Sequence, residues 1–248
     1  MSGRPCAEEQ RAPHPHLRVD RSPAGYRRLL LSRPQQHNAL DAELARALRD
    51  ALAGDPAEPV VLGSTDPGVF CAGADLTIPD ADRATVSDLF YECCEILITR
   101  PGPVIAAVSG PAVGGGAQLA AAADVRIAGP AARLRWTGPP GMDLAVGAWI
   151  LPDLVGRATA LDLIMTARWV DATEALSLGL VSDVVAEPLT AAADLAGDLA
   201  ARGPGPLARA KPVMAAGGLL DRLRTEHQAN QSAWAQALAG GGYGAEAP

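Results

Sequence analysis

Apolar runs of strand length alternate with helix-patterned segments through the first half of the chain, and this alternation limits the folds open to it. The runs are PVVLGS (59–64), PVIAAVSG (103–110) and DVRIAG (124–129). Strands that are apolar on both faces are typical of sheets covered by helices on each side. The sequence therefore predicts an α/β fold, and no linker in the 248 residues is long enough to separate two independent domains.

The spacing of apolar residues predicts the other elements. Leucines at every fourth position from Leu40 to Leu52 predict a helix over 37–54, with Asn38 as its N-cap and Gly54 as its stop. The remaining expected elements are strands at 26–31 and 180–185 and helices at about 86–97, 114–124, 157–167, 171–179, 190–202, 205–216 and 219–239.

Composition along the chain predicts its division into parts. Residues 1–15 and 241–248 are rich in Pro or Gly and poor in apolar residues, which is typical of disordered tails. Between them we expect a core at 16–190 that carries the function and a helical region at 191–240.

Charge and cysteine usage narrow the function classes. The net charge is −7 and the basic residues do not cluster, so we expect no nucleic-acid partner. The four cysteines lack metal-ligand spacing, and we expect no metal site. The first residues contain no apolar stretch, and no run approaches the ~20 apolar residues of a membrane span. We therefore predict a cytoplasmic protein without a membrane span.

Two glycine-bearing segments each come soon after an apolar strand. They are FCAGADL (70–76) and GPAVGGGAQLA (110–120), and the second opens a predicted helix. Both can present backbone N–H groups unobstructed by large side chains, and a helix N-terminus favours negative charge. Two converging N–H groups would form an oxyanion hole. The alternative is that the glycines only allow a helix and a strand to pack closely.

Four motifs taken together resemble the enoyl-CoA hydratase/isomerase (crotonase) family. They are HNAL (37–40), FCAGADL, GPAVGGGAQLA and DATEALSLGLVSDVV (171–185), and the resemblance covers about residues 17–215. It implies a crotonase (ClpP/crotonase-like) fold of repeated ββα units, with C-terminal helices that assemble a homotrimer or a dimer of trimers. It also implies an acyl-CoA thioester as partner, with coenzyme A as part of the substrate and no other cofactor.

The resemblance also implies roles for particular positions. The oxyanion donors would be the backbone N–H groups of Ala74 and Gly115, with the thioester oxygen between them. Arg33 and Lys211 match places where family members put basic residues near the CoA phosphates, although an exposed basic residue is usually a solvated surface charge. The pantetheine and adenine path would be lined, mostly through main chain, by Ala72, Gly73, Asp75 and Leu76.

The chain departs from the family at both glutamates that hydratases use to handle water. The first is replaced by Gln118, which lies three residues after Gly115 and should face the same way. A glutamine amide orients a ligand but cannot act as a general base. The second falls on Gly138, Pro140 or Gly141, depending on where a one-residue gap is placed.

Asp143 is the only acid in the stretch LRWTGPPGMDLAVGAW. Some family members carry a catalytic aspartate near this point, and the position falls on Asp143, Leu144 or Ala145 according to the gap. A helix N-cap or first-turn role is the alternative for Asp143. The aromatic residues Tyr91, Trp136 and Trp149 could line an acyl pocket or belong to the core.

These observations predict an enzyme that stabilises an enolate-like thioester oxyanion. The loss of both glutamates favours a reaction with a single proton carrier over hydration, such as double-bond isomerisation or decarboxylation, with Asp143 as the carrier. The alternative is a non-catalytic acyl-CoA binding protein, since the same donors also serve ground-state binding.

Overall fold

The computed structural model describes residues 14–139, 144–203 and 205–234. Its strands are β1 (Leu17–Ser22), β2 (Tyr26–Leu31), β3 (Val60–Ser64), β4 (Val104–Val108), β5 (Ala112–Val113), β6 (Val125–Ala128), β7 (Arg133–Arg135), β8 (Val170–Asp171) and β9 (Asp183–Val184). Its helices are α1 (Ala42–Leu52), α2 (Asp80–Thr99), α3 (Gly115–Ala122), α4 (Leu151–Thr166), α5 (Ala172–Ser177), α6 (Pro188–Arg202), α7 (Gly205–Ala215) and α8 (Leu219–Trp234), with a 3-10 turn, η1 (Pro34–Gln36), before α1.

Two sheets organise these elements. The larger sheet has the strand order β1-β2-β3-β4-β6-β9, in which β1 is antiparallel to β2 and the other neighbours are parallel. The smaller sheet has the order β5-β7-β8. The three apolar runs form β3, β4 and β6 in the middle of the large sheet, so the predicted α/β class is confirmed.

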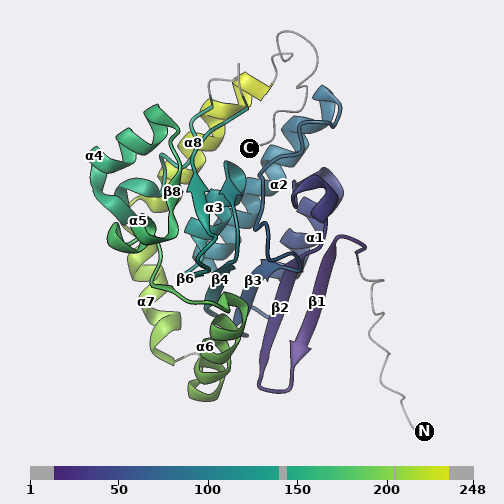
Figure 1. Cartoon of the computed structure of the whole chain (residues 1–248), viewed down its shortest axis with the longest axis vertical. Coiled ribbons are helices and arrows are strands. Elements are labelled where there is room, and N and C mark those ends of the chain that lie inside the picture. The colour runs from purple at the N-terminus through teal and green to yellow at the C-terminus, as the bar shows by residue number, and fades with distance from the viewer. Residues whose placement is uncertain (1–13, 140–143, 204, 235–248) are drawn as a thin grey trace, which may run out of the picture.

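The central strands are buried on both faces because their alternate residues belong to two different cores. Val60 and Leu62 of β3 join the main core with α1, α2 and α3, whereas Val61 faces the opposite way. On that opposite face Val61 packs with Ala192 and Ala196 of α6. Figure 1 shows α6 over one side of the sheet, with α1, α2 and α3 gathered at the other.

The C-terminal part of the described chain is helical, as expected. Helix α8 packs along α2, which brings two segments far apart in sequence side by side (Figure 1). The predicted boundary between 190 and 191 lies inside α6, which packs on the large sheet, and the division into parts stays a prediction. The predicted tails lie almost entirely outside the described residues. Within the described chain, no helix has both the length and the apolar character needed to cross a membrane.

The predicted N-cap of α1 is wrong. Helix α1 begins at Ala42 and is capped by Asp41, whose Oδ1 accepts the N–H of Leu44 at 2.8 Å. Asn38 instead adopts a left-handed conformation with φ of 56° and is fully buried. Asparagine favours the N-cap position, but here its side-chain amide forms hydrogen bonds with residues remote in sequence instead.

The buried Asn38 side chain ties three segments together. Its Nδ2 donates to the Ser64 hydroxyl at 2.7 Å and to the Phe70 carbonyl at 3.0 Å. Its Oδ1 accepts the Arg33 N–H at 2.8 Å. Asn38 therefore fixes the end of β3 and the start of the 70–76 segment against the turn after β2.

We expect Asn38→Ala to lower the free energy of unfolding by roughly 3 kcal/mol, because it leaves buried backbone groups unpaired and places alanine in a left-handed conformation that asparagine tolerates better. Urea denaturation measures this loss, with the exposed Gln36→Ala as the matched control. A loss no larger than that of the control would contradict the role given to Asn38.

Candidate functional site

The two glycine-bearing segments run side by side. Cys71 forms an isolated parallel bridge with Ala112, and the N–H of Val113 donates to the Cys71 carbonyl at 2.9 Å. A Cβ on Gly116 would lie 2.0 Å from the Cys71 carbonyl oxygen, closer than any real contact. Close packing therefore requires glycine at Gly116, and it brings the 70–76 segment against the start of α3.

Two backbone donors meet where these segments touch. Gly73 has φ of 88°, and a Cβ there would lie 3.0 Å from the nitrogen of Gly115. The N–H groups of Ala74 and Gly115 have no hydrogen-bond acceptor among the described residues. Gly115 is also the first residue of α3, where the helix dipole adds partial positive charge. The pair is suited to an oxygen that gains negative charge.

Both donors open into one cavity of about 220 Å³. Of the residues predicted for the site, Ala72, Gly73, Ala74, Leu76, Gly115 and Gln118 line it, whereas Arg33, Asp75 and Lys211 do not. Asp143 lies outside the described residues. The apolar part of the wall consists mainly of Leu40, Val86, Phe90, Val113, Leu144 and Val146.

Gln118 is buried, and the oxygen of its amide already accepts a hydrogen bond within the protein. Its Oε1 accepts the indole N–H of Trp149 at 2.6 Å. An indole nitrogen can only donate, so this bond fixes the orientation of the amide. The NH2 end has no partner among the described residues and is the end available to a ligand. Gln118 can therefore donate to a bound molecule, and it offers no basic atom.

Of the three positions considered for the second glutamate, Gly138 lines the cavity, and Pro140 and Gly141 lie outside the described residues. Leu144, one of the positions considered for a catalytic aspartate, also lines the cavity. No carboxylate lines the cavity in the part of the chain that the structure describes, and Tyr91 is the one titratable side chain there. Burial raises the pKa of Tyr91, so it stays a neutral hydrogen-bonding group.

Three residues at or beside the cavity were not identified from the sequence, and they are Ser87, Glu226 and Asn230. The Tyr91 hydroxyl donates to Glu226 at 3.0 Å and accepts from the amide of Asn230 at 2.9 Å. Glu226 and Asn230 lie on α8, more than 130 residues from Tyr91, and no local pattern signals this contact. Ser87 lines the cavity with a buried hydroxyl that has no partner among the described residues. Its spacing of three and four from Phe90 and Tyr91 on α2 could have revealed it.

Glu226 holds a loop of the cavity wall. Its two carboxylate oxygens accept the N–H groups of Gly147 at 3.2 Å and Trp149 at 3.1 Å. Burial raises the pKa of Glu226 to about 7, although the hydrogen bonds that it accepts act in the opposite direction. The carboxyl therefore changes charge near neutral pH.

Asp75 and Arg33 form an ion pair behind the 70–76 segment. Arg33 Nη1 lies 2.6 Å from Asp75 Oδ2, and Arg33 also pairs with Asp41 at 3.3 Å. Burial alone would raise the pKa of Asp75, but hydrogen bonds from Thr77 and Arg33 outweigh it and lower that pKa. In this structure Arg33 anchors the segment that carries Ala74, and its contact with a CoA phosphate stays a prediction.

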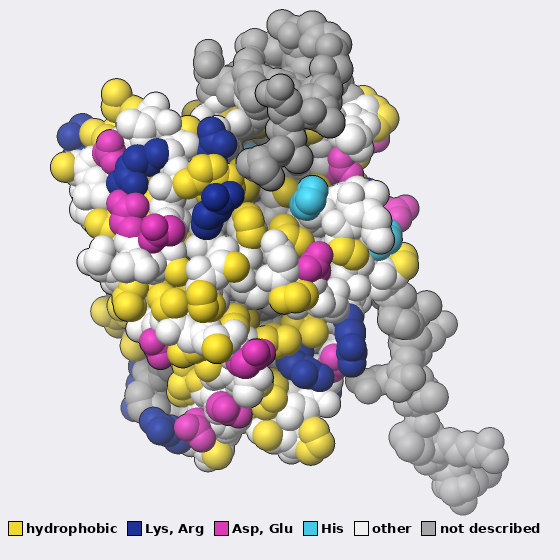
Figure 2. Space-filling model, viewed as in Figure 1, with side chains coloured by type: hydrophobic (Ala, Val, Ile, Leu, Met, Phe, Trp, Pro, Cys, Tyr) yellow, Lys and Arg dark blue, Asp and Glu magenta, His cyan; other side chains and the backbone are white. Residues whose placement is uncertain are grey.

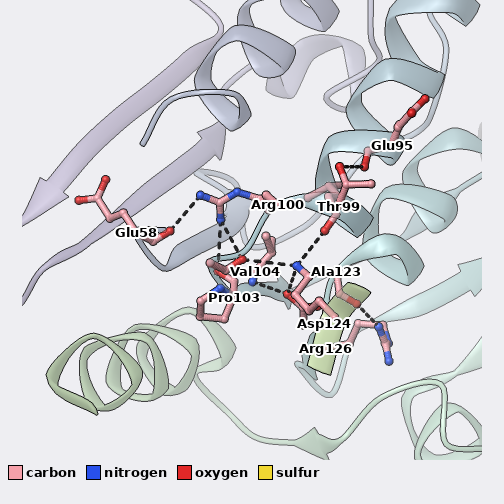
Figure 3. Close-up of polar contacts among 12 residues, drawn as sticks. Glu58, Glu95, Thr99, Arg100, Pro103, Val104, Ala123, Asp124 and Arg126 are labelled. Atoms are coloured by element: carbon pink, nitrogen blue, oxygen red, sulfur yellow. Dashed lines mark hydrogen bonds and ion pairs between the residues drawn. The ribbon is translucent and has the colours of Figure 1, made fainter. Parts of the chain in front are cut away.

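Lys211 lies in a buried polar network away from the cavity. Its Nζ pairs with Asp124 at 2.8 Å and donates to two backbone carbonyls. Figure 3 shows Asp124 and Arg100 in this network, with Asp124 also accepting the Val104 N–H at 2.7 Å. Burial lowers the pKa of Lys211, and Asp124 opposes that shift. Lys211 thus joins α7 to the core, and its contact with CoA stays a prediction.

The charged side chains on the visible face of the molecule are mixed in sign. Figure 2 shows Lys and Arg side chains interspersed with Asp and Glu side chains on that face. The described residues on this face therefore form no continuous basic surface.

Comparison with known proteins shows the family of this chain. Residues 22–239 match the model of the enoyl-CoA hydratase/isomerase family. The chain belongs to the enoyl-CoA hydratase/isomerase, or crotonase, family. YngF of Bacillus subtilis (strain 168), named for this family, is 36% identical over 225 residues that cover 85% of each protein.

Solved structures show the same fold. PA4980 of Pseudomonas aeruginosa shares 34% identity and a TM-score of 0.72, covering 85% of this chain and 97% of that one. An enoyl-CoA hydratase of Mycobacterium avium subsp. paratuberculosis K-10 shares 26% identity and a TM-score of 0.80, covering 91% and 96%. The predicted crotonase fold with its C-terminal helical region is therefore confirmed.

We expect Gly116→Ala to destabilise this crotonase-family protein by about 3 kcal/mol or more, because the new Cβ meets a backbone carbonyl that cannot move alone. The free energy of unfolding in urea measures the effect. Gly205→Ala is the matched control, since a Cβ at Gly205 meets nothing within 4 Å. Equal stability of the two variants would show that the segments are not packed as described.

The raised pKa of Glu226 predicts the sign of a pH dependence. The folded protein holds this proton more tightly than the unfolded chain, so the stability contributed by the group is full below its ordinary value of 4.5 and is lost as pH rises through about 7. The loss amounts to about 3 kcal/mol, at about 1.4 kcal/mol per pKa unit.

Urea unfolding of the wild type and Glu226→Gln across this pH range measures the difference. We expect the stability difference between them to change with pH, and Glu95→Gln, which removes an exposed carboxylate of α2 that pairs with Arg224 on α8, to track the wild type. Parallel pH profiles for the wild type and Glu226→Gln would contradict the burial of a titrating carboxyl.

Proposed function

We propose that this protein binds an acyl-CoA thioester with its carbonyl oxygen between the backbone N–H groups of Ala74 and Gly115 and stabilises an enolate-like oxyanion there. The observation that carries this proposal is a pair of backbone N–H groups, of Ala74 and of the first residue of α3, that have no acceptor among the described residues and line a cavity with largely apolar walls. Members of the family act on acyl-CoA thioesters. Losing one such donor typically costs ~3 kcal/mol of transition-state stabilisation.

The chemistry of the cavity favours a reaction with a single proton carrier over hydration. Hydration in this family depends on two glutamates, and Gln118 stands at the first position with its carbonyl oxygen already bonded to Trp149. A side chain that can only donate to the ligand cannot take a proton from water. Double-bond isomerisation or decarboxylation, with Asp143 as the proton carrier, fits this site better.

The second candidate function is acyl-CoA binding without turnover. It is favoured by the absence of a carboxylate from the cavity wall among the described residues. Asp143→Asn separates the two functions. Turnover of a short 3-enoyl-CoA or a malonyl-type CoA that is lost in this variant, with binding kept, supports the enzyme, and no turnover in either form supports the binder.

Assembly, location and cofactor use are further parts of the proposal. We propose a cytoplasmic homotrimer or dimer of trimers that uses residues 191–240 for assembly and needs no metal or other cofactor besides the CoA of its substrate. Light scattering coupled to size-exclusion chromatography measures the molar mass in solution, and the mass of a monomer would contradict the proposed assembly.

We expect the wild type to hydrate a short 2-enoyl-CoA slowly, at a rate at least about 10²- to 10⁴-fold below that of a two-glutamate hydratase, because each of the two missing glutamates would contribute about this factor. The loss of enoyl absorbance measures the rate. Gln118→Glu keeps an acceptor for the Trp149 indole and adds a carboxylate, so hydration should rise.

Gln118→Met is the matched control, since it fills a similar volume without either property, and it should not gain hydration. Rapid hydration by the wild type would contradict the proposed reaction class. Failure of the wild type to bind either CoA or its thioesters would overturn the proposed function altogether.

A further inference from the structure

We propose that Glu226 is a positioning residue, which acts through the loop 145–149 and Trp149 to fix the amide of Gln118 at the thioester end of the cavity. This inference rests on the proposed function, because it takes the ligand of the cavity to be an acyl-CoA.

The first step is that Glu226 fixes the loop 145–149 through hydrogen bonds to the loop backbone. Glu226 is 4% exposed, and its oxygens accept the N–H groups of Gly147 and Trp149 as well as the Tyr91 hydroxyl. A carboxyl group can accept at both of its oxygens, whether or not it carries its proton, whereas an amide can accept at only one atom, so Glu226 matches N–H groups that converge on two oxygens. Removing it would leave buried N–H groups without a partner.

The second step runs from the loop to the cavity. Trp149 donates its backbone N–H to the Glu226 carboxylate and its indole N–H to the Gln118 Oε1, the latter at 2.6 Å. Trp149 is 1% exposed, so the packed core leaves its indole little room to turn. Fixing the backbone of Trp149 therefore fixes the donor that orients Gln118. That amide lies on the same helix as Gly115, three residues along.

The third step is the spacing of the groups that hold the loop. Arg222 donates to the Trp149 carbonyl at 3.0 Å, and Asn230 bonds both the N–H and the carbonyl of Ala145, at 2.8 and 2.7 Å. Arg222, Glu226 and Asn230 follow one another at intervals of four, so they lie on one face of α8. A single helix face thus holds the loop at both of its ends and at its middle.

A purely structural role for Glu226 makes a different prediction from a positioning role. If Glu226 only stabilises the fold, its loss weakens all ligands alike. If it positions Gln118, its loss weakens ligands with a thioester carbonyl and leaves CoA itself unaffected, because CoA lacks the acyl group that reaches Gln118.

The experiment measures the affinity of butyryl-CoA and of CoA by titration calorimetry for the wild type, Glu226→Gln, Trp149→Phe and the double variant. We expect each single variant to bind butyryl-CoA about tenfold more weakly, with CoA affinity unchanged, and the double variant to be no weaker than either. Glu95→Gln, which removes an ion pair between α2 and α8 with Arg224, should bind as the wild type does.

Equal losses for both ligands, no loss in Glu226→Gln, or losses that multiply in the double variant would each overturn the inference. Such results with butyryl-CoA still bound by the wild type leave the proposed function standing. A wild type that binds neither ligand overturns both.

Should Glu226→Gln fail to fold, hydrogen exchange of the wild type gives a second test. Butyryl-CoA, and not CoA, should slow amide exchange in 145–149 and in α8 together. Protection that is the same with both ligands, or confined to one of the two segments, would overturn the inference.

Discussion

The approach of the Cys71 carbonyl to the start of α3 is the contact on which the site depends. It is possible because Gly116 has no Cβ, and it is reinforced by the bond from the Val113 N–H to the same carbonyl. The contact holds the backbone around Gly73 and Gly115 together, so that two N–H groups from separate segments face one cavity. The two donors themselves are backbone groups and carry no side-chain charge.

The charged side chains near the site form ion pairs or hydrogen bonds with other groups of the protein. Arg33 and Asp75 brace the 70–76 segment from behind, and Lys211 and Asp124 join α7 to the core. The described cavity wall is left with backbone dipoles, the amides of Gln118 and Asn230, hydroxyls and apolar groups. Such a site suits a neutral carbonyl that acquires charge, because its donors are fixed before the charge develops.

The strands and helices that were predictable share a strong apolar pattern. The runs that became β3, β4 and β6 are buried on both faces, and their sequence shows it directly. Strand β1 was missed because it is a polar edge strand with Val19 48% exposed, and β7 and β8 because they are too short to show a period. Asn38 misled as a cap because its real partners, Ser64 and Phe70, are remote in sequence.

The residues of the site likewise fall into those that the sequence indicated and those that it did not. The glycine motifs lie on contiguous segments, and the family resemblance identified Ala74, Gly115 and Gln118 within them; all three line the cavity. The α8 contribution could not, because Glu226 and Asn230 look like ordinary polar residues of a surface helix until the chain folds back on α2. Likewise, Trp149 gives no local sign that its indole sets the orientation of Gln118.

The most direct test of the donor pair is the infrared carbonyl stretch of butyryl-CoA labelled with ¹³C at the thioester carbon. Two fixed N–H donors polarise the carbonyl, so the band should move to lower wavenumber when the thioester binds. A bound thioester whose carbonyl band stays at its position in water would contradict the placement of that oxygen between Ala74 and Gly115.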